Sequence, residues 1–493
     1  MILETLFLIV PLIAAFTVPL GSIFSKKYGR FLSPAVYLAG LILGIIILPD
    51  ILLNSKNLLM GGWKAPYGIN LYYSPLSVGA GTLIYLMGFF ISLNDLNKER
   101  KANYQLLFQL FIFANVGMVL TGDLFNLFVL IEIASITTIS LTASVNQAWG
   151  SRGSLKYLIS AGLTSMLMLT GIGLLYSAAG TLNMAHLSSG GVLGASFGLL
   201  ILVLIFTAFF FEAELFPFNA WVPEVYQGAS SPFSAAVAGI GSMTAGLVLA
   251  RFWVTITAQG AVFQGSIQKM GNILLLVGIA SVLFGELAAL REKKLKKLLG
   301  FSSVGQMGLA VLAFALPVEN AVYAGLFILF AHTLAKPLLL LIAGKFAEIT
   351  GSNNWKEMQG AGRKNPVLGA AFIIASLSLM GIPFFAGFWG KLELLRSLFS
   401  GSGLISAGAV AVLTAVVIEG AYLMRIGHHF FISPERELKS SKNWILSVTV
   451  IVFSVLILWV GICPETIMGV LKKVTADLMD NAVYIKNILG GGI

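Results

Sequence analysis

The sequence contains little of the chemistry on which most enzymes depend. Its single cysteine, Cys463, excludes a disulfide bond within the chain and a cysteine-ligated cluster or zinc site. The four histidines are scattered, apart from the adjacent His428 and His429. No phosphate-binding loop and no nucleophile triad can be recognised. We therefore expect no catalytic centre and no cofactor in this chain.

Charge is also scarce, at 11% of residues against about 25% in soluble proteins. Instead, 57% of residues are hydrophobic, and many stand in runs of roughly 20, the length of a membrane-spanning helix. These runs predict an all-α polytopic membrane protein with about fourteen transmembrane helices. The runs begin near residues 3, 31, 74, 105, 124, 155, 194, 233, 271, 298, 319, 367, 404 and 444. The first run has no basic residues before it, so we interpret it as a membrane helix rather than a cleaved signal peptide.

The basic residues predict the orientation of these helices. With the N-terminus placed outside, most Lys and Arg residues fall in the inside loops. The inside residues are Lys26, Lys27, Arg30, Lys98, Arg100, Lys101, Arg152, Lys156, Arg291, Lys293, Lys294, Lys296, Lys297, Lys356, Arg363, Lys364, Arg436, Lys439 and Lys442. The outside residues are Lys56, Lys64, Lys269, Lys472, Lys473 and Lys486. Because basic loops stay in the cytoplasm, both termini are expected outside the cell membrane. The net charge of +10 comes from these loops between apolar runs, so we expect no nucleic-acid partner.

Two of the apolar runs, the seventh and the twelfth, are interrupted by proline. They read ELFPFNAWVPE around Pro217 and LMGIPFFAGFWGKLELL around Pro383. Because the runs are five helices apart, the second five-helix unit is expected to be inverted relative to the first, as in many ion-coupled transporters. We predict helices 1–3 at residues 1–104, two inverted repeats at 105–260 (helices 4–8) and 261–435 (helices 9–13), and helix 14 with a C-terminal tail at 436–493.

Carboxylates lie inside two apolar runs of the first repeat. Glu132 is the only charge in the core of the fifth run, about two turns from Asp123 at its edge. Glu212 and Glu214 lie at the break of the seventh run, and helical spacing places them on roughly opposite sides unless the helix is unwound there. Ionisable groups in a membrane usually serve ion or proton transfer. The alternatives are a protonated, structural Glu132 and a Glu214 that binds backbone N–H groups freed by the break.

The second repeat carries buried basic residues. His332 and Lys336 are four apart and share one helix face. Histidine titrates near neutrality and a buried lysine releases its proton readily, so the two suit a proton relay, beside a kink predicted at Pro337. Lys391 follows the second break, where carbonyl groups and water can solvate it, and Glu393 marks an exit from the membrane. The alternatives are a packing histidine and lysines that extend to the membrane surface.

Taken together, these motifs resemble the antiporter-like membrane subunits shared by Mrp-type sodium/proton antiporters, respiratory complex I and energy-converting membrane-bound hydrogenase-type complexes. The motifs are TGDLFNLFVLIEI with Glu132, ELFPFNAWVPEVYQGASSPFSAAVAG, KKLLGFSSVGQMG, AHTLAK with His332 and Lys336, and GIPFFAGFWGK with Lys391. The likeness covers nearly the whole chain and is greatest to the Mrp D-type subunit. It implies two inverted antiporter-like repeats, a central line of buried charges and a place in a larger membrane complex.

The chain departs from this family at two positions. The seventh-helix lysine of the family aligns with Glu212, and its eighth-helix lysine aligns with Met243. The first repeat thus keeps its glutamate, Glu132, and loses both lysines. Three interpretations follow: the two glutamates repel so that one holds its proton, they share a sodium ion, or the first half-channel no longer conducts.

We therefore expect a proton-translocating subunit, with sodium as a second candidate ion, in a multi-subunit respiratory, hydrogenase-type or Mrp antiporter complex. Ions would cross mainly through His332, Lys336 and Lys391, and the partners would be the other membrane subunits and the lipid bilayer. The alternative is a standalone secondary solute or cation transporter, which would show a substrate-sized polar cavity between the repeats. A purely structural subunit would leave the buried charges unexplained.

Overall fold

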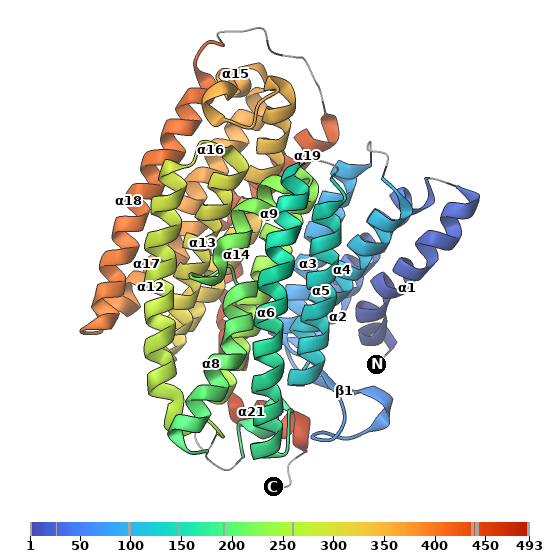
Figure 1. Ribbon diagram of the computed structural model, residues 1–493, viewed down its shortest axis with the longest axis vertical. Helices are drawn as coiled ribbons and strands as arrows, with labels where there is room; N and C mark the ends of the chain where they lie inside the picture. The colour runs from blue at the N-terminus through green and yellow to red at the C-terminus, as the bar shows by residue number, and fades with distance from the viewer. Residues whose placement is uncertain are drawn as a thin grey trace.

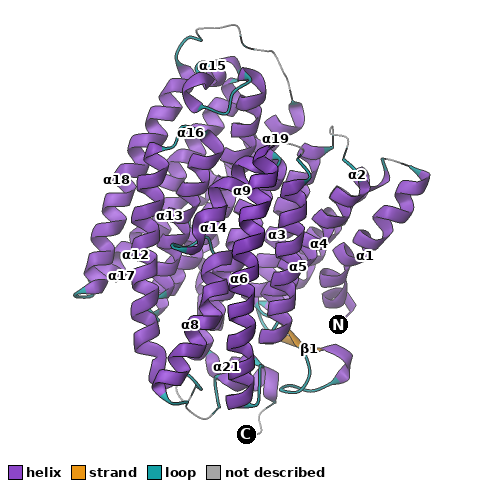
Figure 2. Ribbon diagram, viewed as in Figure 1, coloured by secondary structure: helices purple, strands orange, loops and turns teal. Residues whose placement is uncertain are grey.

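The computed structural model describes residues 2–25, 27–96, 100–145, 148–190, 193–258, 261–434, 438 and 443–490. Nearly all of them are helical, and the long helices stand side by side along the long axis of the molecule (Figure 1). Within the described residues the one sheet is a hairpin of two short antiparallel strands near the lower end (Figure 2).

The first elements of the chain cover the N-terminal part and the segment of the first expected repeat. The N-terminal part contains α1 (Ile2–Phe24), α2 (Tyr28–Ile51), β1 (Lys56–Leu59), η1 (Met60–Gly62), β2 (Asn70–Tyr73) and α3 (Pro75–Asp95). The first expected repeat contains α4 (Ala102–Leu120), α5 (Leu124–Ala143), α6 (Ala148–Ala179), α7 (Met184–Leu187), α8 (Ala195–Glu212), η2 (Phe218–Trp221), α9 (Val222–Gly228), α10 (Ser231–Ala236), η3 (Val237–Gly241) and α11 (Ser242–Ile256).

The rest of the chain continues in the same way. The second expected repeat contains η4 (Gln264–Ser266), α12 (Ile267–Arg291), α13 (Leu295–Phe314), α14 (Glu319–Thr350), η5 (Trp355–Met358), α15 (Ala361–Lys364), α16 (Pro366–Met380), α17 (Gly387–Phe399) and α18 (Leu404–Phe431). It is followed by α19 (Trp444–Ile462), α20 (Glu465–Met479) and α21 (Asn481–Leu489).

The membrane-spanning helices agree with the prediction. Within the described chain, 13 helical segments are long and apolar enough to cross a membrane, with α10 to α11 counted as one. The shorter α16 and α17, on either side of a break, occupy the remaining predicted run. The prediction of an all-α, multi-pass membrane protein is therefore confirmed.

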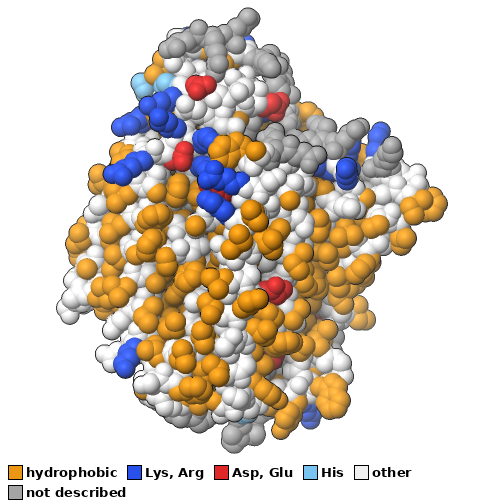
Figure 3. Space-filling view, viewed as in Figure 1, with side chains coloured by type: hydrophobic (Ala, Val, Ile, Leu, Met, Phe, Trp, Pro, Cys, Tyr) orange, Lys and Arg blue, Asp and Glu red, His pale blue; other side chains and the backbone are white. Residues whose placement is uncertain are grey.

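The surface is divided between an apolar belt and a basic end. Figure 3 shows hydrophobic side chains across the middle of the visible face, while Lys and Arg gather toward the upper end. Large apolar side chains are exposed on several helices, for example Met166 and Val417, each 72% exposed. A continuous apolar surface of this kind is stable only in contact with lipid or protein. Both chain ends lie toward the lower end (Figure 1).

Five of the basic residues used to predict the orientation lie outside the described residues. They are Lys26, Lys98, Arg436, Lys439 and Lys442.

The seventh run breaks where α8 ends, at Glu212. The backbone N–H of Glu214 donates to the carbonyl of Phe211 at 3.1 Å, and that of Leu215 donates to the carbonyl of Phe210 at 2.8 Å. These two bonds form a Schellman helix end, which requires a left-handed residue. That residue is Glu214, with φ of 63°. Glycine normally occupies such a position because a side chain there costs roughly 1–2 kcal/mol. A glutamate at this strained position indicates a functional role for its carboxylate.

The twelfth run breaks by the same motif. After α16 ends at Met380, the N–H of Gly381 donates to the carbonyl of Ser378 at 3.0 Å, and that of Ile382 donates to the carbonyl of Leu377 at 3.1 Å. The left-handed residue is Gly381, with φ of 78°. Two distant segments of the chain thus end their helices with one hydrogen-bond pattern.

The Gly381→Ala variant is expected to lose about 1–2 kcal/mol of stability. The φ of 78° disfavours any side chain, and an added Cβ would lie 2.8 Å from Cδ of Lys391. The melting temperature of the purified complex measures this effect. Gly162→Ala is the control, because no atom lies within 4 Å of its added Cβ and alanine favours a helix over glycine by about 1 kcal/mol. Equal melting temperatures for the two variants would contradict the prediction.

The long helix α14 lies at the centre of the bundle. It packs against α10, η3 and α11 of the first expected repeat, and against α13, α16 and α17 of the second. The helix continues through Lys336 and Pro337, the position of the predicted kink. An added Cβ on Gly239 would lie 2.4 Å from Cγ of Pro337, so the proline ring fits against the bare glycine of η3. The element η3 is a π-helical turn, a feature that often occurs at functional sites.

Candidate ion-translocation site

Two glutamates of the first repeat lie near each other between α5, α6 and α8. Glu132 is half-buried and accepts a hydrogen bond from Ser165. Glu212 accepts hydrogen bonds from Ser135 at 3.0 Å and from the hydroxyl of Tyr157 at 3.4 Å. Both carboxylates thus bond side chains of α6, and Ser135, which donates to Glu212, lies one turn after Glu132 on α5. The structure therefore brings together the like charges that the sequence placed on separate helices.

Glu212 and Glu214 line one small cavity. Regular helical spacing would have put them on opposite sides. The helix instead ends at Glu212, and the left-handed backbone of Glu214 lets both carboxylates face the same space. The cavity has a volume of about 30 Å³, enough for one or two water molecules. The helix is therefore unwound after Glu212, which is the case in which the two glutamates need not lie on opposite sides.

Glu214 links the two repeats through hydroxyl groups. Its Oε1 accepts from the hydroxyl of Tyr226 at 2.8 Å and from Ser242 at 2.7 Å. These partners come from α9 and α11 and are side chains, not the backbone N–H groups considered above. The Tyr226 hydroxyl also lies 3.3 Å from Oγ of Ser303, on α13 of the second repeat.

Lys336 and His332 reach toward different elements. Lys336 is fully buried and donates to Oγ of Ser302 at 2.8 Å. Ser302 directly precedes Ser303 on α13. Nε2 of His332 lies 3.2 Å from the carbonyl oxygen of Ala238 in η3, and its Nδ1 has no hydrogen-bond partner within the described chain. The His–Lys pair therefore lies between the two repeats.

Two buried carboxylates that the sequence analysis did not single out extend the line. Nζ of Lys391 lies 2.9 Å from Oε2 of Glu419, and Gln306 donates to both Glu419 oxygens at 2.8 and 3.0 Å. The Tyr422 hydroxyl donates to Glu286 at 2.8 Å. Glu286 and Glu419 are each 1% exposed. Both could have been found from the sequence, because each is a single carboxylate in an apolar run, the criterion that identified Glu132.

The second break holds Lys391 in place. Its ammonium group also donates to the carbonyl oxygen of Leu379, at the end of α16. The lysine is buried rather than extended to the surface. Glu393, two residues further on, pairs with the exposed Arg396 at 2.6 Å and lines a cavity of about 320 Å³ with Glu319.

The remaining predicted residues have local roles. Asp123 caps α5, since its carboxylate accepts from the N–H of Asn126 at 2.8 Å. Met243 is 2% exposed and lines an apolar cavity of about 290 Å³ with Leu247 and Leu329. The position of the second family lysine is therefore an apolar one.

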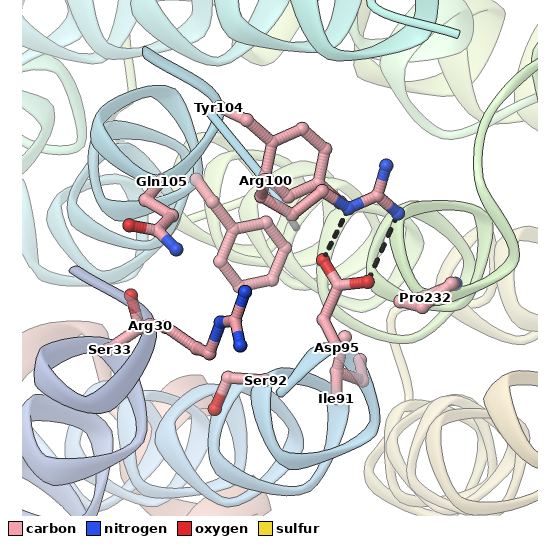
Figure 4. A pocket seen from close by; sticks show the side chains of 10 residues that line it. Arg30, Ser33, Ile91, Ser92, Asp95, Arg100, Tyr104, Gln105 and Pro232 are labelled. Atoms are coloured by element: carbon pink, nitrogen blue, oxygen red, sulfur yellow. Dashed lines mark hydrogen bonds and ion pairs between the residues drawn. The ribbon is translucent and has the colours of Figure 1, made fainter. Parts of the chain in front are cut away.

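A second polar cavity lies between α2, α3 and α4 (Figure 4). Arg100 forms two hydrogen bonds with Asp95, at 2.9 and 3.0 Å, and its guanidinium lies 4.4 Å from the centre of the Tyr104 ring. Arg30 extends toward the middle of the pocket (Figure 4).

Three aromatic rings pack between this pocket and the carboxylate cavity. Phe108 lines the pocket of Figure 4, and Phe111, one turn later on α4, lines the cavity of Glu212 and Glu214. Both rings pack against Phe233, with centroids 6.3 and 5.4 Å away. The carboxylate cavity is therefore closed on this side by packed aromatic side chains.

Comparison with known proteins identifies the family of this chain. The model of the family "NADH:quinone oxidoreductase/Mrp antiporter, TM" matches residues 121–418, more than half of the chain. The chain belongs to this family. The matched segment contains Glu132, Lys336 and Lys391, so the resemblance inferred from the motifs is confirmed.

Relatives of this antiporter-like protein come from several complexes. The D-type subunit of the Na(+)/H(+) antiporter of Alkalihalophilus pseudofirmus is 28% identical over 98% of this chain and 99% of its own. The N-type subunit of the NADH-quinone oxidoreductase of Desulforudis audaxviator is 31% identical over 85% of this chain and 86% of its own. A chain of the membrane-bound sulfane sulfur reductase, an archaeal respiratory membrane complex, matches with a TM-score of 0.91 and 28% identity, covering 98% of this chain and 99% of that one.

Proposed function

We propose that this antiporter-like membrane subunit moves protons through the buried line of its second repeat, inside a multi-subunit respiratory, hydrogenase-type or Mrp antiporter complex. The observation that carries the proposal is the buried ion pair of Lys391 and Glu419, 2.9 Å apart and bonded to Gln306. A buried ion pair is often no more stable than apolar side chains of the same size. Its presence among membrane helices is therefore better explained by a role in ion transfer than by a contribution to folding stability.

The proton path would follow the bonded groups from the first expected repeat to the second. Their order is Glu214 with Tyr226, Ser302 with Lys336, Glu286 with Tyr422, and Glu419 with Lys391. Lys336 is within electrostatic range of Glu214, Glu286 and Glu419. A proton gained or lost at Lys336 would therefore change the proton affinity of the carboxylates on both sides, and water would connect groups that are not directly bonded.

We also infer the orientation of the chain. The basic end in Figure 3 would face the cytoplasm, with both termini outside the cell membrane. This is supported by the position of the chain ends, which lie toward the end opposite the Lys and Arg cluster (Figures 1 and 3). The shared Schellman breaks of α8 and α16 support the division into repeats at residues 105–260 and 261–435.

A standalone solute transporter is less consistent with this geometry. A solute carrier would need a substrate-sized polar cavity between the repeats, and the cavity at Glu212 and Glu214 has a volume of only about 30 Å³. The larger cavity of about 320 Å³ at Glu319 and Glu393 lies between α14, α17 and α20, not between the two expected repeats.

The Glu419→Gln variant tests the proposal. Glutamine has nearly the same size as glutamate but cannot carry the charge opposite Lys391, so we expect proton pumping to fall by about tenfold or more, a change of about 1.4 kcal/mol in the barrier. The complex is purified through a tag on this chain, reconstituted in liposomes, and driven by its electron donor or by an imposed sodium gradient, while a dye reports internal pH. Glu465→Gln, at the exposed start of α20, is the matched control. Normal pumping by Glu419→Gln would refute the proposed path.

A further inference from the structure

The pocket of Figure 4 combines a basic lining with an arginine that has no partner. Two positive charges, Arg30 and Arg100, line it with one negative charge, Asp95. Both oxygens of Asp95 already accept from Arg100, at 2.9 and 3.0 Å. Nε of Arg30 is buried without a hydrogen-bond partner in the described chain, and the guanidinium extends into the space between Gln105 and Asp95 (Figure 4). An unpaired guanidinium beside a paired one points to an anionic ligand.

Gln105 adds a second free donor to the pocket. The residue is 8% exposed, and its amide forms no hydrogen bond within the described residues. The hydroxyls of Ser33 and Ser92 also line the pocket, but they donate to backbone carbonyl oxygens of their own helices, at 3.0 and 2.8 Å. The donors left for a ligand are therefore the guanidinium of Arg30 and the amide of Gln105, and an anion is the ligand that accepts from both.

The pocket has room for the oxygens of an anionic group rather than for a whole metabolite. Its volume is about 30 Å³, the space of one or two water molecules. Two oxygens of a phosphate fit this space, and a guanidinium binds such a pair through two parallel hydrogen bonds. The rest of the ligand would lie at the surface, which the half-buried Arg30 and Arg100 both reach. The ligand is therefore a phosphate carried on a larger molecule.

The surface beside the pocket is apolar along α2. Phe31, Leu38, Ile42 and Ile45 are 61%, 40%, 49% and 59% exposed. At 100° per residue they form one stripe, about a quarter turn around the helix from Arg30. An acyl chain on this stripe would bring its phosphate to the first turn of α2. Anionic lipids are concentrated in the cytoplasmic leaflet, and basic pockets between membrane helices bind their headgroups. One phospholipid therefore matches both the pocket and the stripe.

We propose that Arg30 and Gln105 bind the phosphate of an anionic phospholipid whose acyl chains lie on the apolar stripe of α2. Arg100, held by Asp95, adds positive charge at the edge of the site. The bound lipid lies between the N-terminal helices α2 and α3 and the first expected repeat, because Pro232 of α10 lines the same pocket. It thereby supports the segment that follows the break of α8. This inference goes beyond the proton path and uses none of its residues.

Photo-crosslinking of the purified complex tests the site. The complex is placed in phosphatidylcholine nanodiscs that contain a trace of phosphatidylglycerol with a diazirine on one acyl chain, and a parallel sample contains phosphatidylcholine with the same diazirine. Peptide mass spectrometry measures the labelling of α2 by each probe. We expect about fivefold more labelling by phosphatidylglycerol than by phosphatidylcholine, the preference that one arginine gives for an anionic lipid.

Two matched variants separate the pocket from a general attraction to basic residues. Arg30→Gln removes the charge and keeps a polar side chain, and the preference for phosphatidylglycerol is expected to disappear. Lys27→Gln removes one positive charge from an exposed position one turn earlier, outside the pocket, and should retain the preference. Equal losses in the two variants would show surface attraction alone and would overturn the site.

The wild-type complex is decisive without any variant. Equal labelling of α2 by the two lipids would show that no headgroup is selected, and no labelling by either would show that a partner subunit covers this face. Each result refutes the proposal. Loss of labelling in excess inorganic phosphate, but not in sodium chloride of equal ionic strength, would refute the lipid and assign the pocket to free phosphate. A nanodisc offers lipid on both faces, so the outcome is independent of the orientation of the chain, and Glu419→Gln tests the proton path separately.

Discussion

The Lys391→Ala variant is expected to pump protons at less than about a tenth of the wild-type rate. The substitution removes the ammonium group that pairs with Glu419 and that bonds the end of α16 at Leu379. Glu419, 1% exposed, would be left without its paired cation. Breaking a buried ion pair from one side typically costs about 3–5 kcal/mol, so we also expect a lower melting temperature. Dye-reported pumping and thermal unfolding of the reconstituted complex measure the two effects.

The double variant Lys391→Ala with Glu419→Gln separates the loss of function from the loss of stability. Removing both charges avoids an uncompensated carboxylate, so stability should return toward that of the wild type. Pumping should remain absent, because no proton carrier is restored. Lys269→Ala, on the exposed start of α12, should behave as wild type. Recovery of pumping in the double variant would show that the pair serves only to hold the helices together.

The Lys336→Ala variant is expected to show an equally large loss of pumping with a smaller loss of stability. The direct partner of Lys336 is the neutral hydroxyl of Ser302, so its removal breaks no ion pair. It does remove the cation that lies within electrostatic range of Glu214, Glu286 and Glu419. The same pumping assay and melting temperatures provide the comparison with Lys391→Ala.

The ordering of the two stability effects is itself informative. A larger drop in melting temperature for Lys336→Ala than for Lys391→Ala would contradict the ion-pair assignment. Pumping above about half of the wild-type rate in Lys336→Ala would remove this residue from the proposed path.

Much of the fold could be predicted because its signals are local. Membrane helices require roughly 20 consecutive apolar residues, and the predicted runs correspond to the spanning segments and to the α16–α17 pair. The breaks near Pro217 and Pro383 were visible as prolines within apolar runs. Motifs around Glu132, Lys336 and Lys391 indicated the family that the comparison confirmed.

The partners of the buried charges could not be predicted in this way. Glu286 bonds Tyr422, which is 136 positions away, and Lys391 pairs with Glu419 from a different helix. Glu286 and Glu419 were visible as lone carboxylates in apolar runs, but their partners were not. The cap that Asp123 forms on α5 is a local contact, with Asn126 three residues away.

The sequence by itself determined that this protein crosses the membrane many times, where two helices break and which family it belongs to, because hydropathy and proline act over neighbouring residues. Only the tertiary structure decided which charges meet. Glu212 and Glu214 face one cavity because Glu214 adopts a left-handed backbone that helical spacing does not anticipate. The polar line from Glu214 to Glu419 exists because α14 packs against α10, η3 and α11 as well as against α13, α16 and α17. Packing between distant segments depends on the whole fold.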